Sequence, residues 1–390
     1  MSRLLSIRKV YDMFVLCALA LAMFALIRFP EESISAAAEG LRLSFHVIIP
    51  SLFPFFVLSG LMIRLGLTQY FGRVLEPFMR PLFNVPGIGA SPFVLGFIGG
   101  YPVGAKTTIT LYEDGHITKV EAERLLAFSN NSGPAFILGV VGVGIFASSR
   151  IGLLLYIAHA LSSILVGLIF RFWGYYRPGG GGRNIRAKTS VVRFMPAFLT
   201  SVTSAFHSTL NICAFVTFFT VFIRLLFLSG AIPATAAILG TMFASFGFDS
   251  YWASMLLTGI IELSSGVWSL RDAAGQLSSS IAMAAFMLGW AGISVHCQVL
   301  SFIGDSGLSV RAYILGKSMH GIISAILIFF ITQFFPLPLA VSGALADGVY
   351  GIATMDFSST FVISSLAALF VCMLTFSISL FPRKKTRQTK

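Results

Sequence analysis

Residues 96–106 are Gly-Phe-Ile-Gly-Gly-Tyr-Pro-Val-Gly-Ala-Lys. This stretch continues an apolar run that opens near Ile88, yet it holds four glycines, a proline and a lysine. Glycine and proline interrupt helices, and broken backbone inside a membrane is tolerated only where protein or a water-filled cavity surrounds it. The pattern therefore predicts a re-entrant hairpin over residues 88–111, with a candidate site at its break.

The composition predicts an all-α polytopic membrane protein. Of the 390 residues, 56% are hydrophobic and 11% are charged, and the mean hydropathy is +0.88. Soluble domains carry about twice that share of charge. The net charge is +12, and many of the basic residues lie beside apolar segments in three clusters, at residues 3–9, 171–193 and 383–390. Since such clusters mark the cytoplasmic side of membrane proteins, we expect no nucleic-acid partner.

The sequence lacks the common signatures of enzymes and pumps. It has no HExxH, no GxSxG and no Walker loop. Four cysteines, Cys17, Cys213, Cys297 and Cys372, lie far apart in apolar segments and form no CxxC pair. We therefore expect no catalytic residues, no metal site and no cofactor, and an ATP-driven pump is disfavoured.

The chain divides into five segments. They are an N-terminal membrane helix with an outer loop (1–42), a first repeat (43–173), a basic glycine-rich cytoplasmic linker (174–198), a second repeat (199–335), and an outer loop with a final membrane helix and basic tail (336–390). The second repeat starts from the cytoplasm and the first from outside, which predicts two inverted repeats, as in many secondary transporters. We count about eight full crossings plus two hairpins, with both termini in the cytoplasm.

The first repeat offers two groups of candidate substrate-binding residues. The break supplies Gly99, Gly100, Tyr101, Pro102, Gly104, Lys106 and Thr107, and the head of the next apolar segment supplies Ser129, Asn130, Asn131 and Ser132. Glycine-rich amides, a lysine and asparagine amides suit an anion. Each group also has an alternative interpretation. Lys106 could be an anchor whose side chain reaches the membrane interface, and the polar residues 129–132 could be a helix cap.

The second repeat is interrupted by Gly-Ile-Ile-Glu-Leu-Ser-Ser-Gly at residues 259–266. An ionisable residue inside a membrane is a functional hypothesis by default. Glu262 either couples an ion or contacts substrate, or it is a structural partner for freed backbone amides. Ser264 and Ser265 either join this site or bond back to their own helix. Trp290, whose ring could stack on a ligand as Tyr101 could, and His296 complete the candidate set.

At residues 96–106, 129–134 and 259–266 the chain resembles the YlbJ-type sporulation integral membrane proteins of endospore formers, also called stage V sporulation protein V. These belong with the nucleoside-recognition (Gate) proteins, which resemble the core of concentrative nucleoside transporters. The resemblance covers essentially the whole chain. It implies transport of dipicolinic acid from the mother cell across the outer forespore membrane, on the way to the spore core and cortex maturation.

We therefore expect a transporter of a small organic anion, dipicolinate by resemblance, and no enzyme. The alternatives are a nucleoside-type transporter and a non-transporting scaffold or sensor in a sporulation membrane complex. The expected partners are the anion, the lipid bilayer and further copies of the chain in a homo-oligomer. The coupling ion is either a proton or sodium. The expected location is the bacterial cell membrane, by resemblance the outer forespore membrane.

The basic linker and tail generate a test of the topology. Single cysteines at Gly180 and Gln388 should react with a membrane-impermeant thiol reagent only from the cytoplasm, and one at Asp347 only from outside, because basic segments are retained inside. Labelling of intact cells and inverted vesicles, in a variant without the native cysteines, measures the accessible side. Labelling of Gly180 and Asp347 from the same side contradicts the inverted arrangement.

Overall fold

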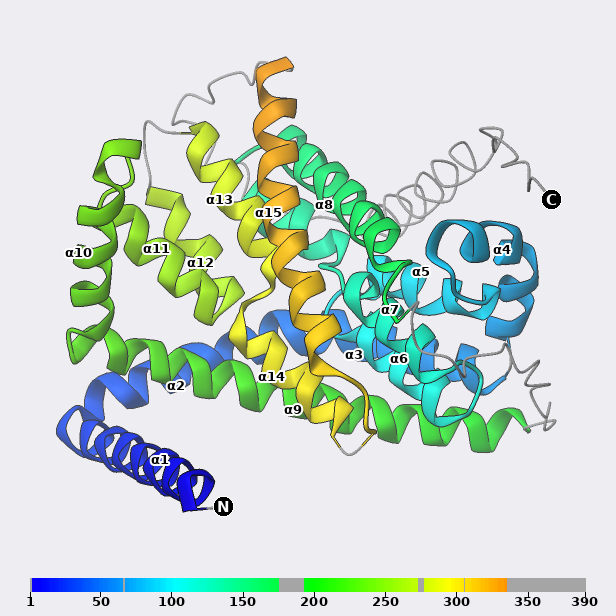
Figure 1. Ribbon diagram of the computed structural model, residues 1–390, viewed down its shortest axis with the longest axis horizontal. Helices are drawn as coiled ribbons and strands as arrows, with labels where there is room; N and C mark the ends of the chain where they lie inside the picture. Colours follow the sequence, from blue (N-terminus) through cyan, green and yellow to red (C-terminus); the bar gives the residue numbers. More distant parts are fainter. Residues whose placement is uncertain (1, 66, 175–192, 273–276, 305, 335–390) are drawn as a thin grey trace.

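The computed structural model describes residues 2–65, 67–174, 193–272, 277–304 and 306–334. Every regular element within these ranges is a helix, as the composition predicts (Figure 1). Most of the predicted linker at 174–198, and the predicted outer loop, membrane helix and tail at 336–390, lie outside the described residues.

The first half of the chain builds short helices before one long one. In order they are α1 (Ser2–Arg28), α2 (Pro30–Leu43), the π-helix η1 (Ser44–Ile48), α3 (Ile49–Arg64), α4 (Leu67–Phe83), the 3-10 turn η2 (Gly87–Gly89), α5 (Ala90–Gly99), α6 (Val103–Glu113), α7 (Lys119–Ser129), the π-helix η3 (Ala135–Ile145) and α8 (Ser149–Phe170).

The second half begins with the longest helix. Its elements are α9 (Phe194–Leu228), α10 (Ala231–Phe243), the 3-10 turn η4 (Ala244–Phe246), α11 (Ser250–Ile261), α12 (Leu263–Ser269), the 3-10 turn η5 (Leu270–Asp272), α13 (Leu277–Trp290), α14 (Gly292–Ile303) and α15 (Val310–Phe334).

Four helical segments are long and apolar enough to cross a membrane, so the chain is an integral membrane protein. They are Ser149–Phe170, Phe194–Leu228, Leu277–Ile303 and Val310–Phe334. Leu75–Phe83 and Gly87–Gly99, bent by 88° relative to each other, make a fifth if the pair counts as one span. The N-terminal helix contributes a shorter apolar stretch, Val15–Arg28. The eight crossings stay a prediction.

Two broken helices followed by an unbroken one occur twice along the chain. In the first set, α5 and α6 part at residues 100–102, α7 and η3 part at residues 130–134, and α8 is continuous. In the second set, α11 and α12 part at Glu262, α13 and α14 part at Ala291, and α15 is continuous. The interruptions predicted near Gly100 and at Glu262 are present, and the inversion of the two sets stays a prediction.

Helix α15 lies among the broken helices and packs against α13, α8 and α7 (Figure 1). A second layer is formed by α2, α3 and α9, which runs along the lower edge in Figure 1 and packs on both of the others. One large cluster of buried apolar side chains fills the first group, and a smaller one joins α3 and α9 to the hairpin. The breaks therefore lie inside protein, where freed backbone groups can find partners.

Small residues let the broken helices approach each other. A Cβ on Gly96 or Gly104 would lie 2.0 or 1.9 Å from the carbonyl oxygen of Ser129, closer than any real contact. Gly292 has a φ of +82°, which favours glycine, and a Cβ there would lie 2.9 Å from the amide nitrogen of Leu263. The hairpin break is therefore pressed against the polar cluster, and the break after α13 against the break before α12.

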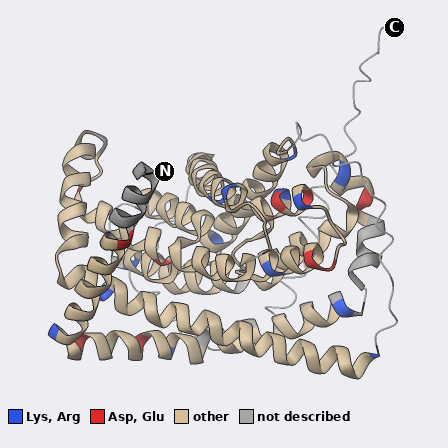
Figure 2. Ribbon diagram, turned by 60° about the horizontal axis from the view of Figure 1, so that its bottom comes forward, with Lys and Arg blue, Asp and Glu red and all other residues tan. Residues whose placement is uncertain are grey.

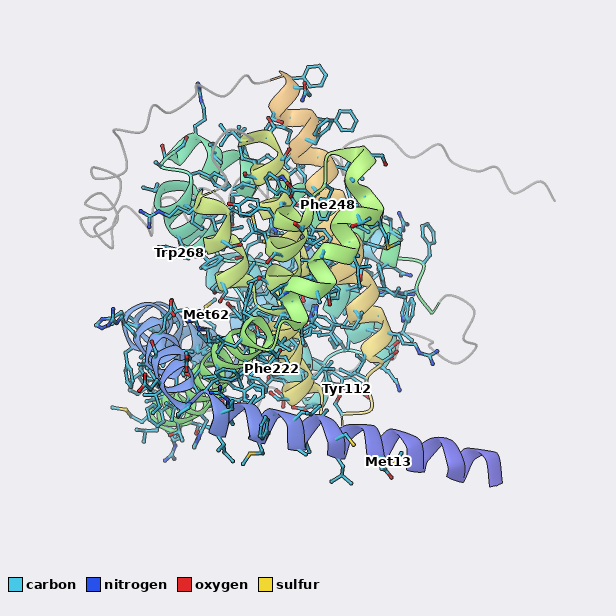
Figure 3. The ribbon with its side chains drawn as sticks, turned by 90° about the vertical axis from the view of Figure 1, so that its left-hand side faces the viewer. Met13, Met62, Tyr112, Phe222, Phe248 and Trp268 are labelled. Carbon is cyan, nitrogen blue, oxygen red and sulfur yellow. The ribbon has the colours of Figure 1, made fainter. Side chains whose placement is uncertain are left out.

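The described part of the protein carries few charged residues. Figure 2 shows acidic and basic residues only sparsely over the helices. The ion pair of Arg80 with Glu76 on α4 is the only one among the described residues. Helix α1 stands apart from the body, with Met13 on it 62% exposed (Figure 3). Such apolar exposure suits contact with lipid.

The segment after α1, expected to be an outer loop, is the helix α2. Pro30 occupies its first turn, where the missing N–H costs nothing, and Glu31 and Glu32 follow at the positive end of the helix dipole. Sequence reasoning weighed the charges of this segment and overlooked that they form a favourable helix start. Its predicted side of the membrane is unaffected by this correction.

Candidate functional site

Lys317 lies in the middle of α15 and is 0% exposed. Its ammonium group donates to the carbonyl oxygen of Asn130 at 2.9 Å, to the Tyr101 hydroxyl at 3.3 Å and to His320 Nδ1 at 3.3 Å. The nitrogen also lies 5.0 Å from the centre of the Tyr101 ring. An ammonium carries three N–H groups, so each donor of Lys317 has an acceptor.

The acceptors around Lys317 belong to the ends of broken helices. Asn130 is the C-terminal cap of α7, and Tyr101 follows the end of α5. The Tyr101 hydroxyl donates in turn to the carbonyl oxygen of Leu288, in the last turn of α13. Helix C-termini carry about half a negative charge each. The partial negative charge at the end of α7 therefore contacts the ammonium directly, Tyr101 links the ammonium to the end of α13, and no carboxylate in the described chain pairs with it.

Two histidines continue the network from Lys317 toward α8. His320 Nδ1 accepts from Lys317, so its Nε2–H donates to the carbonyl oxygen of His159, 3.0 Å away. The two imidazole rings lie 4.3 Å apart between centroids. The backbone N–H of Ser132 donates to His159 Nε2 at 3.0 Å, which places the proton of a neutral His159 on Nδ1.

A second branch runs from Asn130 toward α14. Asn130 Nδ2 donates to the Tyr313 hydroxyl at 3.3 Å, and that hydroxyl lies 3.0 Å from His296 Nδ1. If the Tyr313 hydroxyl accepts from Asn130 and donates to His296 Nδ1, the proton of a neutral His296 lies on Nε2. The His296 ring packs edge-on against Trp290 at 4.3 Å. Residues from both sets of broken helices therefore meet around Asn130.

The rest of the polar cluster is buried and mostly structural. Ser129, Asn130, Asn131 and Ser132 are each at most 1% exposed. Ser129 Oγ lies 3.1 Å from Thr108 Oγ1, and Asn131 Nδ2 donates to the Phe128 carbonyl oxygen at 3.0 Å. The role of this cluster in substrate binding stays a prediction. Its complete burial does not fit the alternative, a helix cap at the membrane interface.

Four buried polar atoms beside Lys317 and its partners have no hydrogen-bond partner in the described structure. They are Asn130 Oδ1, Asn131 Oδ1, His159 Nδ1 and His296 Nε2. Leaving a buried polar group unpaired costs about 1–3 kcal/mol, and such groups cluster where a ligand or water completes them. Two N–H donors beside an ammonium suit an anion, and two amide oxygens suit N–H or O–H donors.

The predicted hairpin residues contact this network through Tyr101. Gly99 ends α5, Gly100, Tyr101 and Pro102 make the break, and Gly104 lies in the first turn of α6. The Tyr101 ring carries the Lys317 ammonium on one face, and Trp290 contacts His296 while its indole N–H donates to the Ile260 carbonyl oxygen at 3.1 Å. Both rings proposed for stacking on a ligand therefore already have intramolecular partners.

Glu262 lies between α11 and α12 and is 2% exposed. Its two carboxylate oxygens accept from the backbone N–H groups of Ser264 at 3.0 Å and Ser265 at 2.7 Å. The side chain thus caps α12, where a negative charge also faces the positive end of the helix. This geometry favours the structural role of Glu262 over the coupling role. It uses the amides of Ser264 and Ser265 rather than their hydroxyls.

Lys106 does not join the Lys317 network. Its ammonium donates to the hydroxyls of Ser208 and Ser204 on α9 and lies over the rings of Phe56 and Phe302. Together with Thr107 and Arg64 it lines a separate cavity of about 100 Å³. The predicted grouping of Lys106 with Asn130 in one site is therefore wrong. Lys106 projects from α6 toward α9, away from the neighbours of Tyr101.

A groove elsewhere in the described structure has no charged side chain in its lining. It holds about 430 Å³ between α11, α13 and α15, and Phe248, Trp252, Met283 and Phe286 are among its lining residues (Phe248 is labelled in Figure 3). Its volume lies within the range of ligand pockets. Since no ionisable side chain lines it, this groove cannot pair with an anion, and the Lys317 network is the better candidate site.

Sequence reasoning missed the residues at the centre of the site. Tyr313, Lys317, His320 and Ser324 are buried polar residues at spacings of four, three and four, which is one face of a helix. Tyr156, His159 and Ser163 on α8 repeat this spacing closely. A polar stripe on an apolar span was the available signal, because an intramembrane lysine is rarely placed without a role.

Comparison with known proteins now identifies the family. A model of the family described as nucleoside recognition (Gate) matches residues 45–169. The sporulation integral membrane protein YlbJ of Bacillus subtilis is 30% identical over 387 residues, which cover 93% of each chain. The chain belongs to the YlbJ family of sporulation integral membrane proteins. The resemblance inferred from the motifs is confirmed.

A second relative matches over a much shorter part of the chain. An uncharacterized protein of Alkalihalophilus pseudofirmus is 34% identical over 129 residues, 32% of this chain and 26% of its own. No solved structure matches the chain. The nucleoside-recognition match spans the breaks at Gly100 and Asn130 and ends before Lys317, so the central lysine lies outside the matched region.

The cap on α12 generates a stability prediction. Glu262→Ala leaves two buried N–H groups without acceptors and should destabilise the protein by about 1–2 kcal/mol. Glu262→Gln retains one acceptor oxygen and nearly the same shape, so its loss should be smaller. Reversible unfolding of the purified variants in detergent measures both.

Asp249→Ala is the comparison variant, because Asp249 caps α11 through one bond, from the Trp252 N–H at 3.0 Å, and is exposed. It should cost less than Glu262→Ala, because water can replace its bond. Equal stability of wild type and Glu262→Ala, or equal loss in the Gln and Ala variants, contradicts the capping role.

Proposed function

We propose that this protein transports a small organic anion across a membrane and that Lys317 provides the positive charge that receives it. The observation that supports this most is a fully buried lysine in a membrane span, with no carboxylate partner among the described residues. Burying a charge without a counter-ion costs several kcal/mol. The binding of an anion offsets part of that cost, which gives the site its preference for negative ligands.

The broken helices supply what a transport site needs around that charge. Backbone groups freed at the breaks can bind a ligand at membrane depth, and half-helices can move against one another. Asn130 comes from the first set of broken helices and His296 from the second, and both reach Tyr313. A ligand at this junction contacts both sets, so it can respond to their relative movement. We propose that the two sets are inverted repeats within about eight crossings, with both termini in the cytoplasm.

The proposed substrate is dipicolinate, which the family resemblance implies. It is a planar ring with two carboxylates. The Lys317 ammonium supplies a positive charge for them, and the unpaired ring nitrogens of His159 and His296 can donate to their oxygens when protonated. The proposed direction is from the mother cell across the outer forespore membrane. The name of the Bacillus subtilis relative, a sporulation integral membrane protein, supports a role in the same process.

A nucleoside-type substrate is the second candidate. The unpaired oxygens of Asn130 and Asn131 need donors, which nucleobases carry and fully ionised dipicolinate lacks. The family description, nucleoside recognition, points the same way. A scaffold or sensor is disfavoured, because such a role gives no reason to bury Lys317. We propose no enzymatic activity for the chain.

Replacing the charge tests the proposal. Lys317→Met keeps a flexible side chain of similar length and removes the buried charge, so the protein should still fold, with lower stability because the Asn130 carbonyl loses its donor. Removing the partner of a bound carboxylate costs about 2–5 kcal/mol, so dipicolinate uptake should fall at least about tenfold. Uptake of labelled dipicolinate into proteoliposomes, with uridine and adenosine as competitors, measures the effect and compares the two substrate classes.

Lys119→Met is the matched control, because Lys119 is an exposed lysine at the start of α7. It should leave uptake unchanged. Wild-type uptake by a well-folded Lys317→Met protein would remove Lys317 from the transport site. Strong competition by nucleosides together with no dipicolinate uptake would favour the second candidate.

A further inference from the structure

The environment of the Lys317 ammonium is that of a bound cation. Its acceptors are a helix-end carbonyl, a phenol oxygen and an imidazole nitrogen, all uncharged. Secondary transporters that use sodium bind it with unwound backbone carbonyls and the C-terminal ends of half-helices. Here the C-terminal end of α7 contacts the nitrogen of a lysine instead, and Tyr101, which follows α5, links that nitrogen to the end of α13.

We infer that Lys317 is a tethered cation that occupies the place of a coupling sodium ion, so that this protein works without sodium. The inference rests on the proposed transport function and names the ion requirement of the same site. The ammonium is held by a covalent stem from α15, so it is present in every state of the protein. A free sodium ion bound to the same carbonyl oxygen, which lies 2.9 Å from the ammonium nitrogen, would lie beside a positive charge and is excluded by repulsion.

No negatively charged side chain among the described neighbours of Lys317 could serve as a ligand for a sodium ion. His159, His296 and Tyr313 face this region from α8, α14 and α15, and each is neutral in the hydrogen-bond pattern described above. Sodium sites usually include hard oxygen ligands, and carboxylates serve that purpose for cations in general. Glu262, which could be one, is occupied with the N–H groups of α12.

The test removes the lysine side chain and leaves the groups that accept its hydrogen bonds. In Lys317→Ala the carbonyl of Asn130 and the hydroxyl of Tyr101 lose their donor, and the space of the side chain is freed. Sodium should then bind there. We expect a saturable rise in the Tm of purified Lys317→Ala with sodium chloride over choline chloride at equal ionic strength, and no such rise in wild type. Ethylammonium, which resembles the lost end of the side chain, should act like sodium.

Lys317→Met is the control, because its side chain fills the space without a charge and should show no specific response to either cation. In proteoliposomes, wild-type uptake of dipicolinate should be the same in sodium and in choline. Uptake by Lys317→Ala should be at least about tenfold lower than wild type in choline and should recover in part with sodium or ethylammonium.

The outcomes separate the two proposals. A sodium-dependent Tm or a sodium-dependent uptake in wild type overturns the tethered cation, as does a folded Lys317→Ala protein whose Tm responds to neither cation. The Tm measurement needs no substrate. If wild type carries neither dipicolinate nor nucleosides while Lys317→Ala gains a sodium response, the proposed function fails and the tethered cation stands.

Discussion

The hydrogen bond from the Lys317 ammonium to the carbonyl oxygen of Asn130 is the contact on which the rest of the site depends. It joins the continuous helix α15 to the end of the broken helix α7. A lysine in an apolar span is costly unless acceptors surround it, and an interrupted helix is costly unless donors reach its carbonyls. Here the lysine supplies the donor that the freed carbonyl needs, and the carbonyl supplies an acceptor that the lysine needs. Neither the polar face of α15 nor the break after Ser129 would be tolerated alone at membrane depth.

The same constraint explains the glycines and the histidines. Gly96 and Gly104 bring α5 and α6 against the Ser129 carbonyl, which places Tyr101 beside Lys317. His320 and His159 then extend the network to α8. The packing is close enough that most polar atoms are paired, and four that are not lie beside these residues. A junction that is tightly built and incompletely hydrogen-bonded is what a ligand-binding site in a membrane requires.

The amino-acid sequence was sufficient for some of these features and insufficient for others. Glycine and proline at residues 99–102 predicted the break, because their backbone chemistry acts locally. The position of Asn130 and Asn131 at the head of an apolar segment left a substrate site and an interfacial cap both open, and only the packing of α7 against α15 shows their burial. Lys106 was wrongly grouped with them, because the direction in which α6 points its side chain depends on where α9 packs. Glu262 had two open roles, and only the positions of the Ser264 and Ser265 amides favour one. Lys317 was not predicted, because it lies in an unbroken apolar helix and its partner, the Asn130 carbonyl, is brought to it only by the packing of α7 against α15.

The central claim is that an anion binds at Lys317, and a ligand-bound structure tests it most directly. Single-particle electron microscopy of the full chain in nanodiscs with saturating dipicolinate would locate the ligand. We predict a carboxylate within hydrogen-bond distance of Lys317 Nζ, with the unpaired nitrogens of His159 or His296 facing its oxygens. Dipicolinate bound in the Lys106 cavity or in the apolar groove beside Phe248, with the Lys317 network unchanged, would contradict the claim.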